Sequence, residues 1–180
     1  RMSNIVILMG SVRKGGNTDL LVQAFAEGAE KNNTVEIISA ADSKVNPCIG
    51  CNTCFEREGN RCFQEDDMQE IYGKLKAADV LVIASPVYFY GISAQLKALI
   101  DRLHTPMRSE FKINKLALIL VGAATLPELF DSIKIQYQLV LNYFKLEDAG
   151  TVLVRGAKDK GDVKNTGGLE EAYQLGLSIV

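Results

Sequence analysis

Short apolar runs alternate along this chain with longer segments in which apolar residues recur at helical spacing. Five runs have the length and composition of β-strands: Asn4–Met9, Thr34–Ser39, 80–84, Lys115–Val121 and a run within 149–154. The run 80–84 is apolar at every position, as expected of a central strand that is covered on both faces. Because parallel strands are joined by crossover connections, usually helices, this alternation predicts an α/β fold with helices on both faces of a parallel sheet.

The segments between these runs carry apolar residues three and four positions apart, which indicates amphipathic helices. The first helix is expected over about 17–31, and the last begins near Leu169. Residues that favour a helix start mark the three helices between them: Asp66 or Asp67, Ser93, and Pro127. We find no internal repeat and expect a single domain over residues 2–180.

The loops that follow the carboxyl ends of the strands have the most unusual composition of the chain. They are 10–18, a cysteine-containing loop at 46–65, 85–91 and 122–126. In a parallel sheet such loops meet at one edge, where open α/β sheets bind their ligands. We therefore expect the functional site at that edge.

The loop 10–18 (GSVRKGGNT) joins the first strand to the first helix. Its glycines allow close approach of the backbone, and the helix presents free N–H groups and the positive end of its dipole to an anion. Four side chains suit phosphate oxygens: Ser11, Arg13, Asn17 and Thr18. The loop matches neither GxGxxG nor GxxxxGK(S/T), which favours the single terminal phosphate of FMN over NAD or ATP. The alternative is a glycine-rich turn in which Asn17 or Thr18 only caps the helix.

The loop 85–91 (SPVYFYG) holds three aromatic residues in succession, more than a simple turn needs. An isoalloxazine ring is a flat aromatic system with a polar rim. Tyr88 and Phe89 offer an aromatic surface for such a ring, and the backbone around Gly91 offers hydrogen-bonding groups for its rim. The alternative is that these aromatic residues belong to the core or to a subunit interface.

Together, the motifs at 10–18 and 85–91 resemble those of the NADPH-dependent FMN reductase family of flavodoxin-like proteins, over about residues 2–150. The resemblance implies a flavodoxin-like three-layer sandwich with a five-stranded parallel sheet of order 2-1-3-4-5. It implies bound FMN, NAD(P)H as a transient donor, and a homodimer or homotetramer. It assigns the FMN phosphate to Ser11, Arg13, Asn17 and Thr18, and the isoalloxazine to Pro86, Val87, Tyr88, Phe89 and Gly91.

The four cysteines of the chain form a compact series, Cys48-x2-Cys51-x2-Cys54-x7-Cys62. Gaps of two residues let successive thiolates turn toward one centre. The series is similar to that of the iron–sulfur flavoproteins within the same family, which implies a [4Fe-4S] cluster on these four residues, beside the flavin. Two alternatives stay open: unmetallated thiols or disulfides, and a structural zinc site built from four thiolates.

The overall charge and hydropathy narrow the class of protein further. A formal net charge of -2, with no basic stripe, argues against nucleic acid as a principal partner. The chain contains no apolar run of about 18 residues that would span a membrane, and we expect a soluble, cytoplasmic protein.

Two functions fit these features. The first is an FMN-dependent NAD(P)H oxidoreductase that passes electrons to a flavin, quinone or other small acceptor, with no catalytic side chain of its own. The second is an iron–sulfur flavoprotein electron carrier that exchanges electrons with a protein such as ferredoxin.

Overall fold

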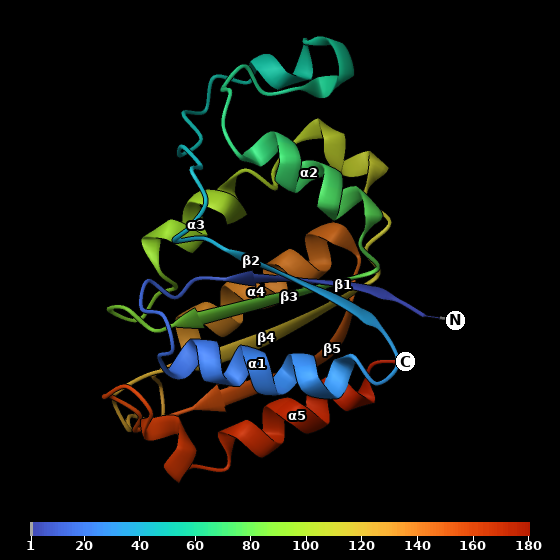
Figure 1. The fold of residues 1–180 in the computed structure, drawn as a ribbon. Helices are drawn as coiled ribbons and strands as arrows, with labels where there is room; N and C mark the ends of the chain where they lie inside the picture. The colour runs from blue at the N-terminus through green and yellow to red at the C-terminus, as the bar shows by residue number, and fades with distance from the viewer. Residues whose placement is uncertain (1) are drawn as a thin grey trace.

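The computed structural model describes residues 2–180 and contains five strands and five α-helices that alternate along the chain (Figure 1). The strands are β1 (Asn4–Met9), β2 (Thr34–Ser39), β3 (Val80–Pro86), β4 (Lys115–Val121) and β5 (Glu147–Val154). The helices are α1 (Asn17–Ala29), α2 (Met68–Ala77), α3 (Ala94–Asp101), α4 (Asp131–Phe144) and α5 (Gly168–Ser178). Four short 3-10 helices complete the chain: η1 (Thr53–Phe55), η2 (Glu58–Asn60), η3 (Pro106–Glu110) and η4 (Asp162–Asn165).

The strands form one parallel sheet in the order β2-β1-β3-β4-β5. Ile5 of β1 is paired with Val35 on one side and with Val80 on the other. The α/β class, the parallel sheet and the strand order 2-1-3-4-5 are therefore confirmed.

Alternate residues of the central strands point to opposite faces of the sheet, and each face has its own core. On one face, Leu8, Ile83 and Leu118 pack with the apolar sides of α2, α3 and α4. On the other face, Ile7 and Val82 pack with α1 and α5. This division produces the three layers that Figure 1 shows, with α1 and α5 together below the sheet.

Helices α1 and α5 pack so closely that two glycines are required at their contact. A Cβ on Gly28 would lie 2.2 Å from the carbonyl oxygen of Tyr173, and a Cβ on Gly176 would lie 2.1 Å from that of Phe25. No side chain fits at these distances without moving a helix backbone.

The structure confirms one predicted helix start, refines a second and corrects a third. Ser93 is the N-cap of α3, and its Oγ accepts a hydrogen bond from the backbone N–H of Leu96. Asp67 occupies the N-cap position of α2, whereas the carboxylate that binds the backbone N–H of Met68 belongs to Asp66.

The predicted start of α4 at Pro127 is wrong, because residues 127–130 form a turn and the helix begins at Asp131. The guanidinium of Arg155 binds the carbonyl oxygens of Leu126 and Pro127, at 2.9 and 2.7 Å, and lies over the ring of Phe130. These carbonyls therefore face the end of β5 and do not enter the helix.

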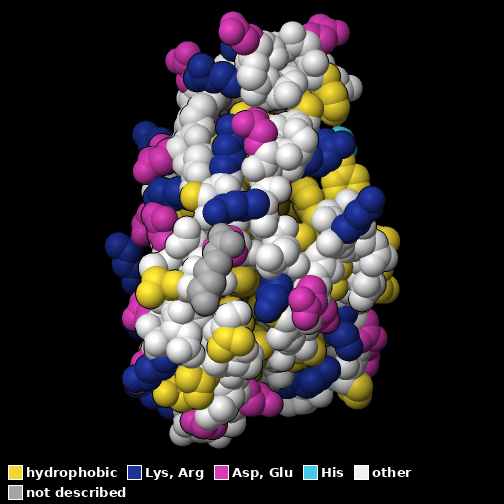
Figure 2. Space-filling model, turned by 90° about the vertical axis from the view of Figure 1, so that its right-hand side faces the viewer, with side chains coloured by type: hydrophobic (Ala, Val, Ile, Leu, Met, Phe, Trp, Pro, Cys, Tyr) yellow, Lys and Arg dark blue, Asp and Glu magenta, His cyan; other side chains and the backbone are white. Residues whose placement is uncertain are grey.

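The surface carries charges of both signs. On the face shown in Figure 2, Lys and Arg side chains lie among Asp and Glu side chains and do not gather into one basic surface. None of the helices within residues 2–180 combines the length and the apolar character that a membrane span requires.

Candidate functional site

The loop between β1 and α1 folds back on itself before the helix begins. The Oγ atom of Ser11 donates to the carbonyl oxygen of Arg13 at 2.8 Å and accepts from the backbone N–H of Arg13 at 3.2 Å. Gly15 has a φ of 68°, in the region that favours glycine, and its N–H donates to the carboxylate of Asp19. This turn leads to Gly16, the N-cap of α1, and places the unpaired N–H groups of the first helical turn at the carboxyl edge of the sheet.

The side chain of Asn17 has a different task from the predicted one. It is 4% exposed, and its Nδ2 atom donates to the carbonyl oxygens of Ala157 and Asp159 at 3.3 and 3.0 Å. Its Oδ1 atom accepts from the backbone N–H of Val163 at 3.0 Å. The amide is thus engaged with the loop after β5, so a phosphate at this edge would meet the backbone N–H of Asn17 rather than its side chain.

Thr18 and Arg13 keep their polar groups available. Thr18 is 3% exposed, and within residues 2–180 no hydrogen bond uses its hydroxyl. Arg13 is exposed and forms no ion pair with any other residue of that range. Thr18 lines the cleft described below, and its hydroxyl is not among the fully buried polar atoms that lack a partner, so it is open to that cleft.

The aromatic segment after β3 is a tight turn. Tyr88 and Gly91 exchange two backbone hydrogen bonds, at 2.9 and 3.0 Å, so the N–H of Gly91 is already used. Phe89 and Tyr90, at the tip, have φ values of 47° and 67°. A non-glycine residue in this region is strained by about 1–2 kcal/mol. The strained tip leaves Phe89 97% exposed.

The first loop and the aromatic segment line one cleft of about 220 Å³. Of the predicted residues, the following line it: Ser11, Arg13, Asn17, Thr18, Pro86, Val87 and Tyr88. Phe89 and Gly91 lie beyond it, in the turn. Sequence reasoning missed Ala157 and Lys158, which come from the loop after β5. Their position after the carboxyl end of the last strand is the signal that could have found them.

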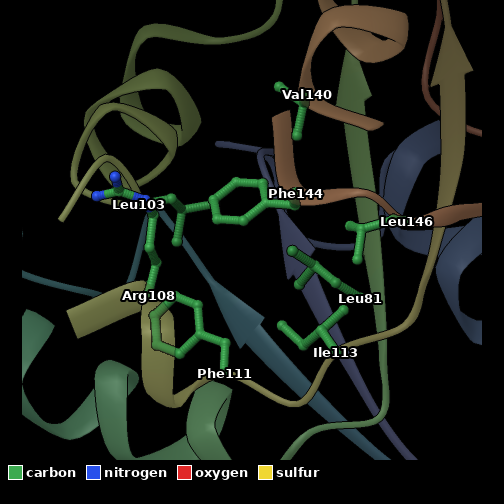
Figure 3. A pocket seen from close by; sticks show the side chains of 8 residues that line it. All are labelled: Leu81, Leu103, Arg108, Phe111, Ile113, Val140, Phe144 and Leu146. Atoms are coloured by element: carbon green, nitrogen blue, oxygen red, sulfur yellow. The ribbon is translucent and has the colours of Figure 1, made fainter. Parts of the chain in front are cut away.

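A second cavity lies at the amino edge of the sheet, far along β3 from this cleft. It is about 70 Å³ in volume, too small for a flavin ring, and it is lined by Leu81, Leu103, Arg108, Phe111, Ile113, Val140, Phe144 and Leu146. Figure 3 shows apolar side chains from β3, the end of α4 and the segment before β4 pointing into it. It has the character of a gap in the core and takes no part in the candidate site.

The cysteine loop leaves the carboxyl end of β2 but does not lie along the edge of the sheet. Figure 1 shows it rising past α2, on the side of that helix turned away from the sheet. The predicted position of the cysteines beside the flavin edge is therefore wrong for a single chain. Residues 46–65 instead pass over the outside of α2 and η3. Cys62 there lines one hollow together with Tyr72 of α2 and Met107 of η3.

The four thiols are free, with Cys48 and Cys51 exposed. Backbone N–H groups donate to two of the sulfur atoms, from Gly50 to Cys48 and from Gln64 to Cys62, both at 3.4 Å. The hydroxyl of Thr53 lies 3.3 Å from the sulfur of Cys51 and lowers the pKa of that thiol. Burial raises the pKa of Cys54, and the other three thiols raise it further. Within residues 2–180, no three His, Cys, Asp or Glu side chains are gathered closely enough to hold a metal ion.

A buried ion pair closes the neck of this loop. Arg102, just after α3, forms a bidentate pair with Asp66, at 2.7 and 3.2 Å, and also donates to the carbonyl oxygen of Asn46 at 2.9 Å. The side chains of Arg102 and Asp66 are 2% and 4% exposed. Burial alone would raise the pKa of Asp66, but hydrogen bonds from Arg102 and from the backbone N–H groups of Asn46 and Met68 hold it below its usual value. The pair thus binds both arms of the cysteine loop.

Comparison with known proteins agrees with this geometry. The sequence model of NADPH-dependent FMN reductases matches residues 3–154. The chain is 39% identical to an iron–sulfur flavoprotein of Methanocaldococcus jannaschii, covering 97% of this chain and 94% of that protein. It is 40% identical to an iron–sulfur flavoprotein of Methanosarcina thermophila, over 65% of this chain and 59% of that protein.

Solved structures share the fold at lower identity. An NAD(P)H:quinone oxidoreductase from Methanothermobacter marburgensis superposes with a TM-score of 0.80 at 16% identity, covering 99% of this chain and 98% of that one. An FMN-dependent NADH-azoreductase from Bacillus anthracis, in complex with FMN, has a TM-score of 0.71 at 17% identity, with coverages of 97% and 98%. The chain therefore belongs to the NADPH-dependent FMN reductase family, and its relatives within that family include the iron–sulfur flavoproteins.

Proposed function

We propose that this protein is an FMN-dependent NAD(P)H oxidoreductase that passes electrons to a flavin, quinone or other small acceptor. The observation that carries the proposal is the cleft at the carboxyl edge of the sheet. It joins the N-terminus of α1 and the unpartnered hydroxyl of Thr18 to the aromatic side chain of Tyr88. A ligand that carries a phosphate group and a flat aromatic ring, as FMN does, could contact both ends of this cleft at once.

At the phosphate end, the chain supplies three kinds of donor: the N–H groups of the first turn of α1, the hydroxyl of Thr18 and the guanidinium of Arg13. Ser11 contributes by holding the turn through its two bonds to Arg13. At the ring end, Pro86, Val87 and Tyr88 form one wall. Gly122 and Ala123, at the end of β4, also line this part of the cleft.

When bound, FMN accepts a hydride from a reduced nicotinamide and transfers electrons onward. The residues that line the cleft include no His, Asp or Glu side chain. Direct hydride transfer between stacked rings needs no acid or base, so the task of these residues is to orient the reactants and to supply positive charge.

The test is flavin binding followed by oxidation of NADH and NADPH. The purified protein is stripped of flavin and titrated with FMN by fluorescence quenching, and oxidation of each nicotinamide is then measured without oxygen and with a quinone. We expect FMN binding and nicotinamide oxidation that depends on it. Tyr88→Ala is expected to weaken FMN and riboflavin alike, since both carry the ring. FMN binding without nicotinamide oxidation would refute the reductase and leave an electron carrier.

The electron carrier is the second candidate, and the four free cysteines of one loop favour it. Four thiols in one loop, with N–H groups directed at two of the sulfurs, are the type of donor set that an iron–sulfur cluster uses, so Cys48, Cys51, Cys54 and Cys62 are the proposed ligands. A 4Fe–4S cluster would have to draw these thiols together, because they are not gathered around one centre in this structure. Such a cluster would supply one-electron exchange with a protein partner such as ferredoxin.

Anaerobic purification followed by iron and sulfide assays tests this candidate. We expect about four irons per chain, as the cluster type implies, and loss of iron in Cys54→Ser. Zinc in place of iron, or neither metal, would leave the oxidoreductase as the better proposal and the cysteines as structural or unmetallated thiols.

We also propose that the protein forms a homodimer or homotetramer. Helix α4 exposes Ile135, Leu139 and Tyr143 at successive turns, at 63%, 61% and 47%. The hydroxyl of Ser132 in the same helix binds the backbone of Tyr90, so this apolar side is linked to the exposed Phe89. Gel filtration with light scattering is expected to show an oligomer that Leu139→Asp dissociates. A monomer in the unmodified protein would refute the proposal.

A further inference from the structure

Two lysines from the loop after β5 lie against the loop before α1. Lys158 lines the cleft together with Ser11 and Thr18. The side chain of Lys160 lies over Gly15, because its Cε and Nζ atoms are 3.2 and 3.5 Å from the position that a Cβ on Gly15 would occupy. No ion pair within residues 2–180 involves either lysine. Lys158 therefore brings positive charge to the cleft and Lys160 brings it to the adjoining loop, and neither charge is neutralised by an ion pair within residues 2–180.

The loop that carries these lysines is held in place by Asn17. As described above, the amide of Asn17 makes three hydrogen bonds to the backbone of Ala157, Asp159 and Val163. These bonds join residues 140 to 146 positions apart in the chain. They hold the backbone of the loop that carries Lys158 and Lys160 against the start of α1.

The acidic residues nearby do not cancel this charge by pairing with the lysines. The carboxylate of Asp19 accepts from the N–H of Gly15 at 2.8 Å. The carboxylate of Asp162 accepts from the backbone N–H groups of Lys158 and Asp159, at 3.2 and 2.8 Å. Both carboxylates thus bind backbone donors and shape the two loops.

Each of these features favours the binding of a phosphate group. The first turn of α1 offers N–H donors, the hydroxyl of Thr18 lines the cleft and has no partner within the described chain, and the lysines add positive charge. Phosphate monoesters occur both in FMN and in the ribose 2′-phosphate of NADPH. Lys158 shares its cleft with Thr18, at the start of α1, which favours the phosphate of FMN.

We infer that Lys158 and Lys160 bind the phosphate of FMN, and that Asn17 is a positioning residue that holds their loop against the α1 N-terminus. This inference rests on the proposed binding of FMN. It adds a second phosphate-binding segment, which follows the residues matched by the family sequence model.

The test compares FMN with riboflavin, which has the same ring and no phosphate. Dissociation constants for both are measured by fluorescence quenching for the unmodified protein and for Lys158→Gln, Lys160→Gln, their double variant and Asn17→Ala. The matched control is Lys164→Gln, an exposed lysine of η4 that does not line the cleft. The ratio of the two constants isolates the phosphate, because a general loss of folding weakens both flavins together.

We expect Lys158→Gln to reduce the preference for FMN about tenfold, in the range of a lost charge-assisted hydrogen bond, and the double variant to reduce it further. Asn17→Ala is expected to match the double variant and to expose the loop to trypsin. Asn17→Asp, which keeps the acceptor for Val163, provides a second variant if Asn17→Ala does not fold. Lys164→Gln is expected to leave the ratio unchanged.

An unchanged ratio in the double variant would overturn the inference while leaving the proposed function intact, provided that the unmodified protein binds FMN. A changed KM for NADPH but not NADH, with the FMN-to-riboflavin ratio unchanged, would also overturn it, since the lysines would then serve the nicotinamide cofactor. If the unmodified protein binds neither flavin, the proposed function itself fails.

Discussion

Replacing Asp66 by Asn is expected to destabilise the protein by about 3 kcal/mol, because it leaves the guanidinium of Arg102 buried without its counter-charge. The carboxylate of Asp66 accepts four hydrogen bonds, two from Arg102 and one each from the backbone N–H groups of Asn46 and Met68. Asn keeps one acceptor oxygen and places an NH₂ group where the other stood. The Nε atom of Arg102 already lacks a partner within residues 2–180, so the guanidinium has little other compensation.

The size of the effect follows from burial. Breaking a buried pair by removing one partner costs about 3–5 kcal/mol, and the oxygen that Asn retains places Asp66→Asn at the lower end. The exposed pair of Lys97 and Asp101 provides the control, since its side chains are 45% and 44% exposed. Asp101→Asn is expected to cost less than about 0.5 kcal/mol. The double variant Asp66→Leu/Arg102→Met removes both charges and is expected to recover more than half of the loss.

Urea denaturation followed by circular dichroism measures these differences as changes in midpoint at constant slope. The pH dependence is an additional check. The pKa of Asp66 is lower in the folded protein than in the unfolded chain, so its stabilisation is complete above about pH 5 and is lost as the pH falls through the folded-state pKa. The difference between the two proteins should therefore shrink at acidic pH. A loss below about 1 kcal/mol at neutral pH would refute the role assigned to the pair.

Three further predictions concern the phosphate loop, the helix contact and the aromatic turn. Arg13→Ala should weaken FMN binding by about 1.5–3 kcal/mol and leave riboflavin unaffected, as measured by fluorescence quenching; equal effects on both flavins would contradict a phosphate contact. Gly176→Ala should lower the unfolding free energy by about 1–3 kcal/mol or more, since its Cβ would lie 2.1 Å from a carbonyl oxygen of α1, whereas Gly73→Ala, with open space around it, should not. Phe89→Asn should raise the unfolding free energy by about 0.5–1 kcal/mol, because Asn tolerates the positive φ of 47° and the exposed ring loses no packing. An unchanged or lower urea midpoint would show that the turn is not strained.

Much of the fold could be predicted from the sequence because its signals are local. The runs predicted for β1, β2 and β4 match the observed strands to the residue. In β1 and β4 the reason is burial on both faces, which requires nearly continuous apolar side chains. Strand β2 lies at the edge of the sheet and is less buried, so it tolerates polar residues such as Glu36. Ser93 marks the start of α3 because capping depends only on a hydroxyl and the next turn of backbone. The strand order followed from the family resemblance of two loop motifs.

The sequence by itself thus determined the class of fold, the edge of the sheet that carries the cleft and most of the residues that line it. Only the tertiary structure decided which of those side chains are available. Asn17 looked like a phosphate ligand, but residues 140 to 146 positions away occupy its amide, and no local pattern encodes such a partner. Packing likewise decided that Arg102 closes the neck of the cysteine loop and that the loop extends over α2, because both depend on which elements become neighbours once the apolar faces are buried.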